Sequence, residues 1–200
     1  MSGVLLNATD VAVERGERQL LTGVSLTVSA GELWQVTGAN GLGKTSLLRG
    51  LAGLSRFGVT GDIRLMSPVL YLGHLPANKP LLSPIDNLRW HPSGRRQAAL
   101  SEIETALAAV GLVGFEDSPL NTLSAGQQRR VALARLWLAS EPLWLLDEPF
   151  TAVDIDGVQL LEQRLVDHVE EGGAVVFTSH QPNRFGDRVN ILKLGEFASG

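Results

Sequence analysis

Cysteine is absent from the sequence. Its absence excludes a disulfide framework and every metal site that needs a thiolate ligand, and it fits the reducing conditions of the cytosol. Long apolar runs are absent too, since no stretch reaches the ~20 residues that span a bilayer. The first residues, MSGVLLNATDVAVERGE, lack the basic segment and the apolar core of a signal peptide, so we expect none. If the protein acts at a membrane, we expect another chain to supply the membrane part.

Positive charge is scarce. Seventeen Lys and Arg residues stand against 21 Asp and Glu residues, which gives a net charge of −4 and a pI of about 5.6. No basic tract of five or more residues occurs, and the tightly spaced basic pairs are Arg95-Arg96 and Arg129-Arg130. Binding to a phosphate backbone needs a concentrated positive face, so the composition disfavours a nucleic-acid partner.

The length of the chain, 200 residues, is typical of one domain with a sizeable core. Strand-like and helix-like apolar patterns alternate along it. We expect strands at 4–14, 23–32, 33–38, 68–74, 143–149, 173–180 and 189–194, and helices at 44–54, 95–110, 124–139 and 156–170. This order predicts an α/β fold with a mostly parallel sheet core, an antiparallel β N-terminal part and a helical subdomain inserted at approximately 76–140. We expect residues 1–200 to form a single domain.

A glycine-rich loop, GANGLGKTS, fits the pattern G-x-x-x-x-G-K-[ST] of loops that hold nucleotide phosphates. Its glycines let backbone N–H groups approach the phosphates, and the next helix adds its positive N-terminal end. Lys44 reaches the β- and γ-phosphates, and Thr45 offers its hydroxyl to Mg²⁺. Lys44 is one of three lysines against fourteen arginines, which fits a site that needs a compact point charge. The predicted nucleotide-binding residues are Gly38, Ala39, Asn40, Gly41, Leu42, Gly43, Lys44, Thr45 and Ser46.

Two further polar segments follow apolar strands. LWLLDEP ends in Asp147, which can hold Mg²⁺, and Glu148, a second carboxylate that can accept a proton from the attacking water or orient it. TSH places His180 at the end of another strand, where it could contact the γ-phosphate, because parallel sheets bind ligands at the carboxyl ends of their strands. The alternatives are a solvated acidic pair and a structural or merely exposed histidine. We expect His91 and His168 to be structural or merely exposed histidines.

The segment LSAGQQRRVALAR begins a helix at which Ser124 is a natural N-cap and Gly126 leaves the backbone open, so the helix start can act as a second anion site. It resembles the signature motif of ABC-type ATPases, usually LSGGQ, with Ala125 in place of one glycine. The phosphate loop, LLDEP, TAVD and TSH occur in the order of that family, and the resemblance covers nearly the whole chain. The chain is identified as a P-loop NTPase of ABC type. Within that family it resembles the ATP-binding subunits of the bacterial cytochrome c maturation system.

The resemblance implies an ATPase that uses ATP and Mg²⁺ as a homodimer, with each ATP between the phosphate loop of one subunit and the signature helix of the other. Ser124, Ala125, Gly126 and Gln127 would then contact ATP in trans, and Asp154 would link the two sites. The resemblance also implies an integral membrane permease as partner and a peripheral location on the cytoplasmic face of the bacterial inner membrane. The implied cargo is haem, either exported or released from a periplasmic chaperone. The sequence holds no haem-ligand motif such as C-x-x-C-H, so no direct haem ligand is evident.

The sequence departs from the family pattern at two positions. The family carries a glutamine after the strand at 68–74, and the aligned residue is Leu75, which can neither coordinate a metal nor orient water. The family also places an aromatic ring upstream of the phosphate loop to stack on adenine. The aligned position lies near Arg15, whose guanidinium plane can stack on a base or simply face solvent. We also hypothesise that a loop-like segment with Leu88 and Trp90 receives the membrane partner.

Two alternatives remain open. An ABC ATPase for a different cargo, including one that serves translation or DNA repair, shares these motifs. Relatives of that kind carry tandem domains or long coiled-coil insertions, and this sequence has neither. An ATP-gated clamp that barely hydrolyses its nucleotide fits Leu75. Glu148 favours hydrolysis, because a pure clamp would not need it.

Overall fold

The computed structural model describes residues 3–55, 57–75, 77–89, 98–180 and 184–199. The chain forms two compact units. The first contains Met1–His74, Glu141–Pro149 and Val166–Gly200, and the second contains Leu75–Ser140 and Phe150–Leu165. The second unit therefore includes a later segment, Phe150–Leu165, as well as the region where the sequence predicts a helical insertion.

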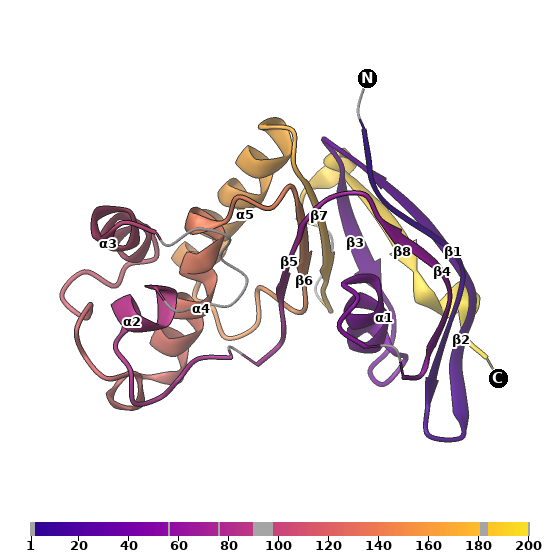
Figure 1. Cartoon of the computed structure of the whole chain (residues 1–200), viewed down its shortest axis with the longest axis horizontal. Coiled ribbons are helices and arrows are strands. Elements are labelled where there is room, and N and C mark those ends of the chain that lie inside the picture. Colours follow the sequence, from indigo (N-terminus) through magenta and orange to yellow (C-terminus); the bar gives the residue numbers. More distant parts are fainter. Residues whose placement is uncertain (1–2, 56, 76, 90–97, 181–183, 200) are drawn as a thin grey trace. The chain divides into compact units, whose positions relative to one another are not determined.

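A parallel sheet of five strands forms the centre of the first unit (Figure 1). Its order is β5-β6-β7-β3-β8, and every adjacent pair is parallel. The strands are β3 (Leu33–Thr37), β5 (Val69–Leu72), β6 (Leu143–Leu146), β7 (Ala174–Thr178) and β8 (Val189–Lys193). Every residue of β6 and β7 is buried, as expected for parallel strands covered on both faces, whose sequences are continuous apolar runs.

The first unit also contains an antiparallel sheet with the order β2-β1-β4. β1 (Val4–Arg15) and β2 (Arg18–Ser29) largely alternate between buried and exposed positions, which is why the sequence predicts them. β4 (Val59–Leu65) is absent from the sequence-based expectation. None of its residues is buried, and Gly61 interrupts the alternate apolar positions Val59, Ile63 and Leu65. Its position depends on a close approach to β1: a Cβ at Gly61 would lie 2.7 Å from the Asp10 carbonyl oxygen.

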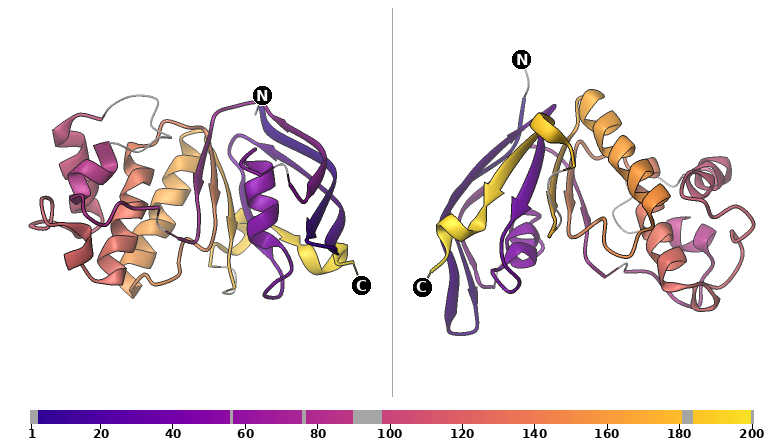
Figure 2. Two further views of the ribbon diagram at one scale, coloured as in Figure 1. Left: turned by 60° about the horizontal axis from the view of Figure 1, so that its bottom comes forward. Right: turned by 180° about the vertical axis from the view of Figure 1, so that it is seen from behind.

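Helix α1 (Lys44–Leu51) lies between the two sheets of the first unit (Figures 1 and 2). Leu47, Leu48 and Leu51 on this helix are buried in one apolar core with residues from both sheets. The helix begins directly after the phosphate loop and ends earlier than the expected 44–54. The core therefore fixes the helix whose first turn borders the loop.

A stacked pair of rings supports β6 from inside the first unit. Trp144 is fully buried, and its ring lies on the imidazole of His168 with centroids 3.6 Å apart and planes 7° apart. The His168 Nε2 atom is 3.1 Å from the Pro142 carbonyl oxygen. His168 is buried, in agreement with a structural rather than an exposed histidine.

The second unit is helical. It contains α2 (Pro84–Arg89), α3 (Leu100–Ala109), α4 (Ala125–Leu138) and the first part of α5 (Ile155–Glu170). Short 3-10 turns occur at Leu120–Thr122 in this unit and at Gly186–Arg188 and Leu194–Phe197 in the first. None of the helices in the described residues combines the length and apolar character needed to cross a membrane.

The segment that the sequence analysis assigns to a loop-like docking surface contains helix α2 instead. The Asn87 side chain organises it, donating to the Lys79 carbonyl at 3.1 Å and accepting from the Lys79 N–H at 2.7 Å. Leu88 is buried in the core of the second unit and so offers no docking surface. Trp90, His91 and the first residues of the helix expected at 95–110 lie outside the described residues.

Candidate nucleotide site

The phosphate loop connects β3 to α1 within the first unit. α1 begins at Lys44, and its N-cap residue Gly43 has φ 98°, in the left-handed region that favours glycine. A Cβ at Gly43 would also approach Val13 and Leu20 to 3.4 Å. Ala39, Asn40, Gly41 and Thr45 are exposed, whereas Gly38, Leu42, Gly43 and Ser46 are half-buried. The loop is therefore accessible to a ligand at the positive end of a helix, where anions bind well.

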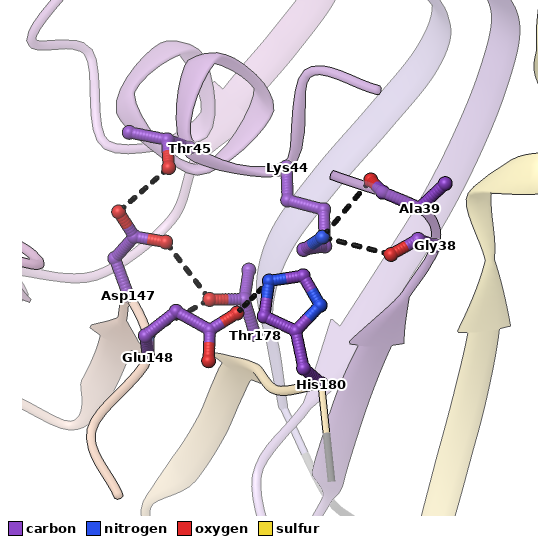
Figure 3. Close-up of polar contacts among 8 residues, drawn as sticks. All are labelled: Gly38, Ala39, Lys44, Thr45, Asp147, Glu148, Thr178 and His180. Atoms are coloured by element: carbon purple, nitrogen blue, oxygen red, sulfur yellow. Dashed lines mark hydrogen bonds and ion pairs between the residues drawn. The ribbon is translucent and has the colours of Figure 1, made fainter. Parts of the chain in front are cut away.

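The Lys44 side chain folds over the start of the loop (Figure 3). Its Nζ donates hydrogen bonds to the Gly38 carbonyl at 2.8 Å and to the Ala39 carbonyl at 3.2 Å. Burial lowers the pKa of Lys44, and the negative charges of Glu148 and Asp147 oppose that shift. The ammonium group is thus positioned over the loop with neutral carbonyl partners that a phosphate can replace.

Asp147 follows the last residue of β6 and is 1% exposed. Its Oδ2 accepts a hydrogen bond from the Thr45 hydroxyl at 2.8 Å, and its Oδ1 accepts one from the Thr178 hydroxyl at 2.8 Å. The low polarity of this region is visible at Tyr71 on β5, where burial, with the charge of Asp147 adding to it, raises the pKa to about 12. Both predicted metal ligands, Thr45 and Asp147, are therefore in direct contact.

Glu148 and His180 face each other across the ends of β6 and β7 (Figure 3). His180 Nε2 is 3.2 Å from Glu148 Oε1, with 47% of the histidine side chain and 14% of the glutamate side chain exposed. The Glu148 backbone has φ 51°, and its N–H donates to the Thr178 hydroxyl at 2.8 Å. A partly exposed histidine thus contacts a mostly enclosed carboxylate at the rim of the site.

These residues gather because β6, β7 and β3 are neighbours in the parallel sheet. Their carboxyl ends supply the acids, the histidine and the phosphate loop, and this edge of an open α/β sheet is where ligands bind. Among the described residues, no group of three or more His, Cys, Asp or Glu side chains could hold a metal ion. Thr45 and Asp147 supply one hydroxyl and one carboxylate, and Mg²⁺ is usually held by one or two carboxylates together with substrate phosphates and water.

The signature residues lie in the second unit, at the start of α4. Ser124 is the N-cap: its Oγ accepts from the Gln127 N–H at 3.2 Å, and the Gln127 side chain accepts from the Ser124 N–H at 2.9 Å. Ser124 and Ala125 are exposed, and Gly126 and Gln127 are half-buried. The predicted cap is therefore confirmed, and the helix start is open to a ligand.

The contacts described above do not include three positions that the sequence singled out, namely Asp154, Arg15 and Leu75. Asp154 is hydrogen-bonded within its own unit, to Arg130 and to the Gly157 N–H. Arg15 is exposed at the end of β1. Leu75 is 78% exposed and begins the second unit.

Sequence reasoning overlooked Thr178, although it belongs to the quoted TSH segment. The signal was a hydroxyl residue at the end of an otherwise apolar strand, directly before the segment that carries His180. Arg130 was noted only as part of a basic pair. Its partner Asp154 lies 24 residues away, so no local pattern joins the two.

The family model described as "ABC transporter" matches residues 21–151. The cytochrome c biogenesis ATP-binding export protein CcmA of Escherichia coli O6:H1 (strain CFT073) is 48% identical over 207 residues, covering 96% of this chain and 98% of the relative. CcmA of Escherichia coli (strain K12) is 48% identical over 189 residues, covering 89% and 90%.

Solved structures show the same fold. An ATP-binding protein of an ABC transporter from Pyrococcus furiosus has a TM-score of 0.82 at 23% identity, covering 97% of this chain and 99% of that one. A dimeric ATP-binding cassette in a post-hydrolysis state, bound to ADP and Pi, has a TM-score of 0.81 at 26% identity and covers 95% of each chain.

Domains of this family bind ATP with a divalent metal ion, form dimers and work with membrane partners. The family model spans more than half of the chain, and the CcmA relatives match it over nearly its whole length. The chain therefore belongs to the ABC transporter family, as an ATP-binding ATPase domain related to the CcmA proteins.

Proposed function

We propose that this chain is the ATP-hydrolysing subunit of an ABC transporter complex that supports c-type cytochrome biogenesis. The observation that carries the ATPase part is the contact set at the carboxyl ends of β6 and β7, where Asp147 meets Thr45 and Glu148 meets His180. The relatives named as cytochrome c biogenesis export proteins support the pathway. Haem is the proposed cargo, either exported or released to a periplasmic chaperone.

The residues of the first unit divide the chemistry among them. Lys44 and the loop amides would hold the phosphates, and Thr45 and Asp147 would hold Mg²⁺, whose positive charge would offset the negative charge of the phosphates. Glu148 is the catalytic base that orients and deprotonates the attacking water. His180, 3.2 Å from that carboxylate, contacts the γ-phosphate and responds to its loss.

The second unit supplies the residues that act across a homodimer. Ser124, Ala125, Gly126 and Gln127 present an open helix start to the ATP held by the other subunit, and Asp154 links the two sites. ATP between the subunits favours the closed dimer, and hydrolysis allows it to open. That shift in population drives the membrane partner.

The proposal includes the setting of the protein. Residues 1–200 form one ABC ATPase domain with a helical subdomain at approximately 76–140. The partner is an integral membrane permease, and the domain is peripheral on the cytoplasmic face of the bacterial inner membrane. Arg15 stacks on adenine, and the chain contributes no direct haem ligand.

A clamp that closes on ATP with little hydrolysis is a second candidate function. It is favoured by one observation: Leu75, which aligns with the family's glutamine, is an exposed apolar side chain. Leucine cannot orient water or bind a metal.

ATP turnover by the purified chain with Mg²⁺, beside Glu148→Gln, separates the two candidate functions. Turnover clearly above that of the variant supports the enzyme, whereas equal rates with retained ATP binding support the clamp. Repeating the assay with the membrane subunit tests whether the partner completes the site.

The pathway is tested in a bacterial strain that lacks its CcmA. Restored covalent haem in c-type cytochromes with the wild-type chain, but not with Glu148→Gln, would support it. Failure of the wild-type chain at normal expression would exclude it.

A further inference from the structure

Thr178 connects the two acids of the candidate site. It is the last residue of β7 and is 0% exposed. Its hydroxyl donates to Asp147 Oδ1 at 2.8 Å and accepts from the Glu148 N–H at 2.8 Å (Figure 3). A hydroxyl has a single proton to donate, so this geometry assigns that proton to Asp147 and a lone pair to Glu148. One buried group therefore contacts both the candidate metal ligand and the candidate catalytic base.

The first contact fixes the orientation of the Asp147 carboxylate. That side chain is almost fully buried, where each oxygen needs a hydrogen-bond donor or a cation. With Oδ1 held by Thr178, Oδ2 is directed at the Thr45 hydroxyl. Thr178 therefore determines which carboxylate oxygen is presented to the metal position, in the way that outer partners orient metal ligands elsewhere.

The second contact fixes the backbone from which the Glu148 side chain extends. A φ of 51° is unfavourable for a residue with a Cβ and persists only where the surroundings enforce it. The bond from the Glu148 N–H to the Thr178 hydroxyl is such an enforcing contact. From this backbone the Glu148 side chain extends so that its Oε1 atom lies 3.2 Å from the Nε2 atom of His180. His180 is two positions after Thr178 in the chain.

We propose that Thr178 is a positioning residue that orients Asp147 for the metal and Glu148 for the water through one hydroxyl group. It acts through these two residues. The inference rests on the proposed ATPase function, and it adds that the hydroxyl, rather than the bulk of the side chain, is the required feature. Serine should therefore replace threonine, whereas valine, which has the same shape without the hydroxyl, should not.

The test compares Thr178→Val, Thr178→Ala and Thr178→Ser in the full chain. Thr105→Val is the matched control, because it removes a hydroxyl bonded at 2.8 Å to the Ser101 carbonyl on an exposed helix face. We expect Val and Ala to lower kcat about 10- to 100-fold, the range seen when outer partners of metal ligands are removed, with the KM for ATP changed less than about 2-fold. We expect Ser to retain most of kcat and Thr105→Val to match the wild type.

A second readout does not depend on turnover: the Mg²⁺ concentration that gives half of the metal-dependent increase in ATP affinity. It should rise about 10-fold or more in Thr178→Val and Thr178→Ala and stay unchanged in Thr178→Ser. If Thr178 had only a structural role, its variants would shift the thermal unfolding midpoint. ATP binding would then change equally with and without Mg²⁺. If Thr178→Val or Thr178→Ala fails to fold, the other still gives the comparison with Thr178→Ser.

Two results would overturn the proposal. One is an unchanged metal dependence in both variants that lack the hydroxyl, and the other is an equal loss in Thr178→Ser. Failure of the proposed function is visible separately, as wild-type turnover no higher than that of Glu148→Gln. Even then the metal titration decides the role of Thr178.

Discussion

Arg130 on α4 and Asp154 in the segment before α5 are paired within one chain. The other carboxylate oxygen of Asp154 accepts from the Gly157 N–H at 3.2 Å, so the side chain also caps the start of α5. Arg130 reaches back to the Val110 carbonyl at 3.5 Å. The residue proposed to act across the dimer is therefore already anchored to the signature helix of its own subunit.

Removing this pair should weaken ATP-driven dimerisation without unfolding the domain. Both side chains are partly exposed, and exposed ion pairs contribute at most about 1 kcal/mol. In a Glu148→Gln background that retains ATP, we expect Arg130→Gln and Asp154→Asn each to raise the dimer dissociation constant several-fold, by a coupling of about 1 kcal/mol. Analytical ultracentrifugation with and without ATP gives the measurement.

The double variant decides whether the two residues act together. If the two residues act as a pair, the double variant Arg130→Gln with Asp154→Asn should raise the dimer dissociation constant no more than the single variant with the larger effect. Fully additive losses would mean that Asp154 acts independently of Arg130. Arg188→Gln is the control, because it removes an exposed arginine from a 3.5 Å pair with Glu170.

The parts of the site that follow local patterns were predictable from the sequence. The phosphate loop is a strand–loop–helix segment whose glycines and Lys44 are adjacent in the chain. Ser124 was recognisable as a cap, and the structure confirms it. Asp147 and Glu148 stand at the end of an unbroken apolar strand.

Features that depend on tertiary contacts were not predictable. β4 has no buried residue and is placed by its pairing with β1 beside Gly61. α2 begins at a proline in a segment that the sequence presents as a loop, and the Asn87 side chain ties it to the preceding backbone. The role of Thr178 depends on a partner 31 residues away, which no periodicity reveals.

Lys44 should be required for ATP binding but not for folding. Its side chain is buried, and burial lowers its pKa, so the charged form is costly in the free protein. We expect Lys44→Met to weaken ATP binding at least about 10-fold, a loss of roughly 1.4 kcal/mol, without lowering the thermal midpoint. Lys193→Met, at an exposed position of β8, should leave both unchanged. Fluorescent-nucleotide titration and thermal unfolding measure the two effects, and a lower midpoint with normal binding would contradict the assignment.

Asp147→Asn should uncouple ATP binding from the metal while preserving the fold. The asparagine oxygen can still accept from Thr178, and its amide can donate to the Thr45 hydroxyl, so both contacts of the buried position remain satisfied. We expect Mg²⁺ to raise the ATP affinity of the wild type and to leave that of Asp147→Asn nearly unchanged. Turnover should disappear in the variant, and in the wild type after chelation. A wild-type-like response to Mg²⁺ in Asp147→Asn would remove this residue from the metal site.

Gly173→Ala should destabilise the first unit through His168. A Cβ at position 173 would overlap the imidazole ring that stacks on Trp144, and the backbone there lies outside the left-handed region, so the penalty is steric. Overpacking of this kind costs about 1–3 kcal/mol of unfolding free energy. We expect that loss in urea unfolding, together with a changed near-ultraviolet signal from Trp144. Gly195→Ala is the control, because nothing lies within 4 Å of a Cβ there.

The cause of that loss can be isolated with His168→Ala. This variant loses the stack and leaves a cavity, so it is itself destabilised. It also frees the space that the new methyl group needs, so adding Gly173→Ala to it should cost less than about 0.5 kcal/mol, the level of ordinary non-additivity. Equal costs of Gly173→Ala in both backgrounds would place the strain in the backbone at position 173 rather than in the packing of the ring beneath β6.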